Sequence, residues 1–389
     1  MPRRDRLSTL HRARMAVTII FLITGALFGT WAARIPAISG HLHLSTGALG
    51  IALSGLEAGA IIGLPLAGVL TAHFGACRTA QAGLLIYCLS LPLVALAPTL
   101  PFLTGLVGIF AIGNSFLDVA MNAAGIAVEQ SYPRPIFSSF HAFWSIGGLL
   151  GSGLGAGAAA IGIPVLLHFG IVSLFSLLPG LLATLWLLTD SVRSPHLFAL
   201  AWPGKPLLVL GLLAFCAFLI EGVMNGWSGV YLHDTVRTDL GFAALGYTIY
   251  TCMMTAGRLM ADAFVARVGA RWFVRCAALF VIGGMSLVLL FATALMTLIG
   301  YGLLGLGVAG IAPIVLREVG HRGSGKQAGP AIAAVTTLGY FGSLCGPALI
   351  GWLAQLSTLR LALGLILISS CFIALFAGQL TGGHLHRER

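Results

Sequence analysis

Three polar side chains interrupt one of the most apolar stretches of the sequence. Residues 116–130 read FLDVAMNAAGIAVEQ and include Asp118, Asn122 and Glu129. On a helix, residues three and four apart share a face, so these three form one stripe with Asn114 and Gly125. If the segment spans a bilayer, a carboxylate at its centre costs roughly 2.5–3.5 kcal/mol. We therefore expect Asp118 to face a cavity or a polar partner.

The next apolar segment, 136–160, carries a second polar stripe at the same spacing. Its members are Ser138, His141, Ser145, Gly148 and Ser152. The two segments are expected to form a helical hairpin around the turn 131–133. Equal distances from that turn would pair Glu129 with Arg134, Asn122 with His141, and Asp118 with Ser145. We interpret the first pair as a closure of the inner end and the other two as walls of one polar pocket.

Two more acids fall near the middle of apolar segments. Glu57 shares its segment with Gly55, Gly59 and Gly63, a spacing suited to close helix contact. Glu221 shares a helix face with Asn225 and Ser228, with Trp227 beside them.

We place no Lys or Arg at the depth of these acids. Each must then be protonated, hydrogen-bonded or matched by a bound cation, and burial favours the protonated form of a carboxyl group. The sequence therefore allows two roles for these acids, as proton carriers or as ligands of a bound cation.

The composition indicates what positions these residues. The 389 residues are 58% hydrophobic and 8% charged, whereas soluble domains carry roughly 25% charged residues. The apolar runs reach the roughly 20 residues that a membrane-spanning helix needs. We predict an all-α membrane protein with twelve spans, at about 15–36, 45–70, 79–97, 101–128, 136–160, 164–188, 206–232, 241–265, 272–293, 295–319, 329–354 and 359–380.

The basic residues predict the orientation. With both termini in the cytoplasm, the outer face holds only Arg34, Arg237 and Arg360 of the 21 Lys and Arg. The net charge of +10 is thus a topology signal rather than a nucleic-acid footprint. The seven Cys form no CxxC pair, so neither a disulfide framework nor a metal site is expected.

The chain divides into two similar halves. The polar segment 189–205 is the predicted cytoplasmic linker between six-helix bundles at 1–188 and 206–389. Gly68–Arg78 reads GVLTAHFGACR and Asp262–Trp272 reads DAFVARVGARW. Aligning Gly75 with Gly269 gives a repeat offset of 194 residues. Two repeats of the same orientation are the layout of transporters with a midplane site.

On these features the chain resembles the major facilitator superfamily over essentially its whole length. The family's loop signature, similar to GxxxDRxGRR, matches Gly68, Gly75 and Arg78 in the first copy and Arg267, Gly269 and Arg271 in the second. Ala72 and Ala266 stand where the signature has its acid, while Asp262 lies one turn earlier. The resemblance implies an inner gate that uses Arg78, Asp262, Arg267 and Arg271. Glu318 with Arg322 would act there too.

Within the superfamily, LDVAMN followed by RPIFSSFHAFWSIGG resembles the fucose-permease-like, proton-coupled sugar importers. That resemblance implies that Asp118 carries the proton, beside the amide of Asn122, and that His141 and Trp144 contact the sugar. Ala32 stands where that branch has a second acid, four residues before Pro36. Glu57 or Glu221 would then replace it.

The sequence therefore predicts a non-enzymatic, monomeric secondary transporter of a prokaryotic inner membrane. It would carry a small polar solute, sugar- or polyol-like, by proton symport, with no cofactor beyond the proton gradient. The proton-coupling residues are Asp118, Glu221 and Glu57, and the solute contacts are Asn122, His141, Trp144, Ser145, Asn225 and Trp227.

Two alternatives remain. The first is a proton-coupled exporter of cationic or lipophilic compounds, in which Asp118 and Glu221 would pair with the drug. The second is a membrane sensor that binds a ligand without moving it.

Overall fold

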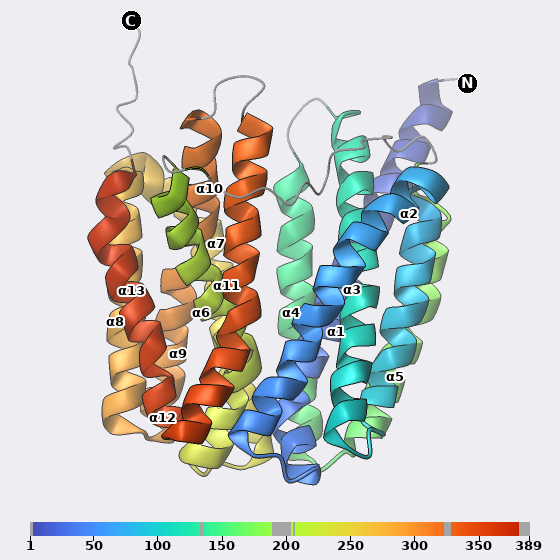
Figure 1. Cartoon of the computed structure of the whole chain (residues 1–389). Helices are drawn as coiled ribbons and strands as arrows, with labels where there is room; N and C mark the ends of the chain where they lie inside the picture. The colour runs from blue at the N-terminus through green and yellow to red at the C-terminus, as the bar shows by residue number, and fades with distance from the viewer. Residues whose placement is uncertain (1–2, 133–135, 189–203, 205–206, 323–327, 381–389) are drawn as a thin grey trace, which may run out of the picture. The chain divides into compact units, whose positions relative to one another are not determined.

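The computed structural model describes residues 3–132, 136–188, 204, 207–322 and 328–380, and these are helical with short turns (Figure 1). The α-helices are α1 Arg3–His41, α2 Thr46–Val94, α3 Leu100–Glu129, α4 Phe137–Ala160, α5 Val165–Thr184, α6 Leu208–Val230, α7 Leu240–Val268, α8 Ala270–Phe291, α9 Ala294–Val308, α10 Ile311–Arg322, α11 Ala328–Leu356, α12 Leu359–Ala362 and α13 Gly364–Phe376. A π-helical turn, Tyr231–Thr235, continues α6, and a 3₁₀ turn, Ala377–Gln379, follows α13. The predicted all-α class is confirmed.

Nine helical stretches of the described residues are long and apolar enough to cross a membrane. One of them, α2, has 49 residues and leaves helical geometry at Gly75, where the prediction separates two spans. The predicted count of twelve requires this division and adds α4 and α7, of 24 and 29 residues. The exact number of spans stays a prediction.

Contacts divide the chain into two compact units. The first comprises Met1–Phe198 and Asp239–Thr248, and the second Ala199–Thr238 and Ile249–Arg389. The first two turns of α7 thus pack with the first unit, although the prediction assigned all of α7 to the second bundle. The predicted linker, 189–205, lies outside the described residues apart from Gly204, and the predicted domain boundaries stay a prediction.

In the first unit, glycines let helix backbones touch. A Cβ on Gly25 of α1 would lie 2.0 Å from the carbonyl oxygen of Trp144, and one on Gly151 of α4 would lie 2.0 Å from that of Ala26. The predicted small-residue face of α2 is used in the same way: a Cβ on Gly59 would lie 2.2 Å from the carbonyl oxygen of Gly108 on α3. Such close approaches favour van der Waals packing between membrane helices.

The second unit repeats the crossing of α2 with α3 at the predicted offset. A Cβ on Gly63 would lie 2.8 Å from Cβ of Ser115, and one on Gly257 would lie 2.8 Å from Cβ of Ala309. Each pair of equivalent positions is separated by 194 residues. Gly75 and Gly269 also share a left-handed backbone, with φ of 84° and 81°, which is accessible chiefly to glycine. The two units are therefore built on equivalent helix pairs.

Candidate transport site

The stripe on α3 places Asp118 against an amide. Nδ2 of Asn122 donates to Oδ1 of Asp118 over 3.0 Å and to the Asp118 backbone carbonyl over 2.7 Å. Asp118 is half-buried, and its neighbours Phe116 and Val119 are buried on the apolar side of the helix. The helix period thus places the carboxylate and the amide one turn apart, as predicted, and gives the carboxylate a neutral hydrogen-bond donor.

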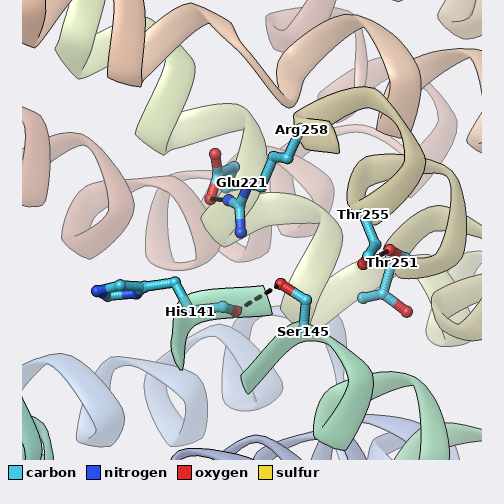
Figure 2. Close-up of polar contacts among 6 residues, drawn as sticks. All are labelled: His141, Ser145, Glu221, Thr251, Thr255 and Arg258. Carbon is cyan, nitrogen blue, oxygen red and sulfur yellow. Dashed lines mark hydrogen bonds and ion pairs between the residues drawn. The ribbon is translucent and has the colours of Figure 1, made fainter. Parts of the chain in front are cut away.

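The α4 residues of the predicted pocket lie mainly beside α1. His141 sits edge-on to Phe21 with ring centroids 5.1 Å apart, and Trp144 lies 6.4 Å from Phe28. The hydroxyl of Ser145 donates to the His141 carbonyl over 3.2 Å (Figure 2).

The prediction made α3 and α4 the two walls of one polar pocket, whereas α4 packs chiefly on α1. Glycines on the facing sides of α1 and α4 allow these two backbones to touch. The prediction considered only how far each residue lies from the turn between α3 and α4. Whether His141, Trp144, Ser145 and Asn122 contact a solute stays a prediction.

Glu129 holds the start of α4. Its Oε2 accepts the backbone N–H groups of Ile136 at 2.7 Å and of Phe137 at 2.5 Å. The first N–H groups of a helix have no partner within it, and negative charge is favoured at that end. The predicted partner, Arg134, lies outside the described residues. In the described part of the chain, then, Glu129 orients α4 relative to the end of α3.

Glu57 lies on α2 and is half-buried. Among the described residues it takes part in no ion pair, and the nearby glycines of α2 bring its helix into backbone contact with α3. Its predicted role in proton coupling stays a prediction.

Glu221 has a fixed cation, which the sequence reading missed. Nη2 of Arg258 lies 3.4 Å from Oε2 of Glu221, joining α6 to α7 (Figure 2). The side chains are 16% and 35% exposed for Glu221 and Arg258 respectively. The expectation that no Lys or Arg reaches these acids is therefore wrong for Glu221.

The signal was present in the sequence, since Arg258 falls inside the predicted span 241–265. The orientation argument leaves Arg258 among the cytoplasmic charges. Its long side chain, however, carries the guanidinium group well away from its own Cα, so that it reaches Glu221.

Trp227 is a packing residue in this conformation. Its indole is fully buried, and Nε1–H donates to the carbonyl of Pro347 over 3.1 Å, joining α6 to α11. At the next position, the Ser228 carbonyl accepts the hydroxyl of Tyr301 over 3.1 Å. Asn225, on the same helix, is half-buried. The only polar atom of the Trp227 side chain is thus already bonded, and its predicted contact with the solute stays a prediction.

The four gate residues predicted from the loop signature are exposed. Asp262 pairs with Arg317 of α10 at 3.7 Å, but its side chain is 94% exposed, and such pairs contribute little stability. Arg78, Arg267 and Arg271 are exposed, and no ion pair joins them to another described residue.

The second predicted gate pair does form. Nε of Arg322 lies 2.9 Å from Oε1 of Glu318, and Arg322 also donates to the carbonyl of Gln379. Their roles in gating stay predictions.

Three relatives match nearly the whole chain, although no family model matches it. The transporter y4wD of Sinorhizobium fredii is 35% identical over 359 residues, covering 92% of this chain and 95% of the relative. The MFS-type transporter YPO1221/y2967 of Yersinia pestis is 30% identical, covering 95% and 96%. The membrane protein MosC of Rhizobium meliloti is 30% identical, covering 92% and 88%.

The chain belongs to the MFS-type transporters.

Solved structures of three transporters share the fold. A mutant of the nucleoside transporter NupG superposes with a TM-score of 0.76 at 15% identity, covering 94% of this chain and 98% of that one. A D-xylose–proton symporter gives 0.72 at 15% identity, covering 93% and 96%. A bacterial homologue of the lysosomal transporter Spinster gives 0.72 at 14% identity, covering 98% and 96%.

The MFS assignment makes the chain a multi-pass membrane transporter and not an enzyme, as predicted. It identifies neither the solute nor the source of energy for transport.

Proposed function

We propose that this MFS-type protein is a proton symporter of a small polar solute, sugar- or polyol-like, driven by the proton gradient without a cofactor. It works as a monomer in a prokaryotic inner membrane, with both termini in the cytoplasm and with the lipid bilayer and the solute as its partners. The observation that carries the proposal is the environment of Asp118. Its carboxylate lies within an apolar helix and is bonded to the neutral amide of Asn122.

This environment suits a group that titrates during transport. Among the described residues Asp118 has no ion pair, so protonation is the direct way to remove its charge while it is buried. Solute and proton are coupled when each lowers the free energy of the conformation that the other prefers.

Glu221 is a weaker candidate for the proton, because Arg258 stabilises its charged form. The same ion pair disfavours the exporter alternative, in which Glu221 would have to pair with a cationic drug.

The test is internal pH in proteoliposomes. Pooled neutral sugars and polyols should acidify the lumen with wild type, and Asp118→Asn should abolish the signal because an amide cannot carry the proton. Asp239→Asn makes the same chemical change at an exposed helix start, where Asp239 accepts the N–H of Phe242 at 2.9 Å. This control should transport like wild type.

Other outcomes would redirect the proposal. Acidification that persists in Asp118→Asn contradicts the role of Asp118. Alkalinisation with pooled organic cations, and no response to the neutral pool, would favour the exporter.

A further inference from the structure

A cavity of about 390 Å³ lies at one end of the first unit. It is formed by the C-terminal ends of α1, α2 and α4 with the turns that follow them, and by the starts of α5 and α7. Arg34 and His41 are the polar side chains among its described lining, and the others are Ala, Gly, Ile, Leu, Pro or Val. Its volume falls within the range of small-molecule sites, roughly 300–1,000 Å³. The guanidinium of Arg34 is thus the single permanent charge among the described residues that line a mostly apolar cavity.

Arg34 is a buried cation with no counter-charge among the residues that the structure describes. The residue is 4% exposed, and one nitrogen, Nη2, donates to the Ile163 carbonyl over 2.7 Å. Nε and Nη1 are buried and reach no acceptor among the described residues. A guanidinium does not lose its proton in a protein, and an uncompensated buried ion carries a penalty on the order of several kcal/mol. The bond to a neutral carbonyl leaves that charge uncompensated.

A second polar group beside Arg34 is unsatisfied in the same way. His168 of α5 is 6% exposed, and both ring nitrogens are buried without a hydrogen-bond partner among the described residues. It stands in the first turn of α5, where its backbone N–H donates to the carbonyl of Pro164, the residue after Ile163, but it does not line the cavity itself. A neutral imidazole offers one N–H donor. Two guanidinium nitrogens of a cavity-lining residue therefore lack acceptors among the described residues, and an imidazole without a partner lies in the adjoining turn of α5.

We propose that the cavity binds an anion whose carboxylate or phosphate head is held by Arg34. The fork of a guanidinium matches two oxygens of such a head group, and the apolar wall would cover an apolar body. A free organic anion and an anionic lipid both present this chemistry. The site goes beyond the proposed function, because none of its residues belongs to the set proposed to carry proton or solute. In the predicted topology it opens on the outer side.

The first experiment measures thermal unfolding of the detergent-purified, full-length protein against potassium butyrate or phosphate, with potassium chloride at equal ionic strength as reference. Wild type should show a saturable rise in Tm. Arg34→Gln should need an at least about tenfold higher anion concentration, a difference of about 1.4 kcal/mol. Arg360→Gln is the matched control, because Arg360 is predicted on the same face but is exposed and bonded to the carbonyls of Leu289 and Leu290.

The second experiment distinguishes the two sources. Native mass spectrometry should detect a retained anionic phospholipid on wild type and Arg360→Gln, but not on Arg34→Gln, if a lipid occupies the site. A response to free anions without retained lipid identifies a soluble ligand.

The proposal is overturned if wild type shows neither a Tm response nor a retained lipid, or if Arg34→Gln behaves like wild type in both measurements. Should Arg34→Gln fail to fold, Arg34→Lys keeps the charge but loses the guanidinium fork. A weakened response in that variant supports the proposal, and an unchanged response contradicts it.

Discussion

The two acids that the sequence placed near the middle of α3 and α6 have different partners. Asp118 is bonded to the neutral amide of Asn122, whereas Glu221 faces the guanidinium of Arg258. A neutral donor leaves a buried carboxyl group free to be neutralised by a proton, while a fixed cation favours the carboxylate. At the scale of single residues, this difference separates a proposed proton carrier from an ion pair that joins two helices.

We expect Glu221 and Arg258 to be energetically coupled. In a cycle of Glu221→Gln, Arg258→Gln and the double variant, the coupling should be about 1 kcal/mol, because each single change leaves a charge without its partner. The exposure of Arg258, 35%, keeps the value below that of a fully buried pair. Thermal unfolding in detergent measures it. Glu57→Gln combined with Arg258→Gln serves as control and should be additive, and additive effects for Glu221 and Arg258 would contradict the prediction.

At the scale of elements, glycine decides which helices touch. The backbone contact of α4 with α1 requires positions without a Cβ, and it overrides the sequence neighbourhood of α3 and α4. Gly151 lies in this contact, whereas Gly153, two residues along the same helix, has no neighbouring atom within 4 Å of a Cβ built on it. The two glycines therefore form a matched pair for testing the crossing.

Gly151→Ala should destabilise the protein by about 1–3 kcal/mol, because its Cβ would lie 2.0 Å from the Ala26 carbonyl oxygen and the helices would have to separate. Gly153→Ala should be neutral or stabilising by up to about 1 kcal/mol, from helix propensity alone. Thermal unfolding of the two variants side by side gives the comparison. Equal stabilities would mean that α1 and α4 do not depend on this contact.

At the scale of the whole molecule, the repeat of 194 residues appears in backbone conformation as well as in sequence. Gly75 has φ of 84° and ψ of 161°, and Gly269 has φ of 81° and ψ of 157°. A side chain is strained in this region whatever the surrounding space, at a cost of about 1–3 kcal/mol. Since nothing lies within 4 Å of a Cβ at either position, the strain can be tested without a steric clash.

Gly75→Ala and Gly269→Ala should therefore lower stability by similar amounts, and the double variant by about their sum, because the two positions lie in different units. Unfolding measured by intrinsic tryptophan fluorescence is a suitable readout. Gly283→Ala, a helical position with the same open surroundings, should show no loss. A large loss at one glycine and none at the other would mean that the repeats are not equivalent.

Part of the fold and of the site follows from the sequence alone. Apolar runs longer than a bilayer needs determined the helical membrane class, and helix periodicity determined that Asp118 and Asn122 share a face. The spacing of glycines in the two loop copies determined the repeat offset. These features depend only on residues within one helix or on the comparison of two segments, so the sequence contains them directly.

The partners of the polar groups were decided by the tertiary structure. Sequence spacing did not indicate that the carboxylate of Glu129 accepts the first N–H groups of α4, and its predicted pairing with Arg134 stays a prediction. It left Glu221 without a cation, yet Arg258 reaches it from the next helix. It placed Arg34 among the outer-face charges, yet the residue is buried and donates to the carbonyl of Ile163, just before α5. Each of these contacts joins segments that are apart in the sequence. It forms only if the helix backbones approach closely enough and a long side chain extends far enough. The periodicity within one segment specifies neither condition.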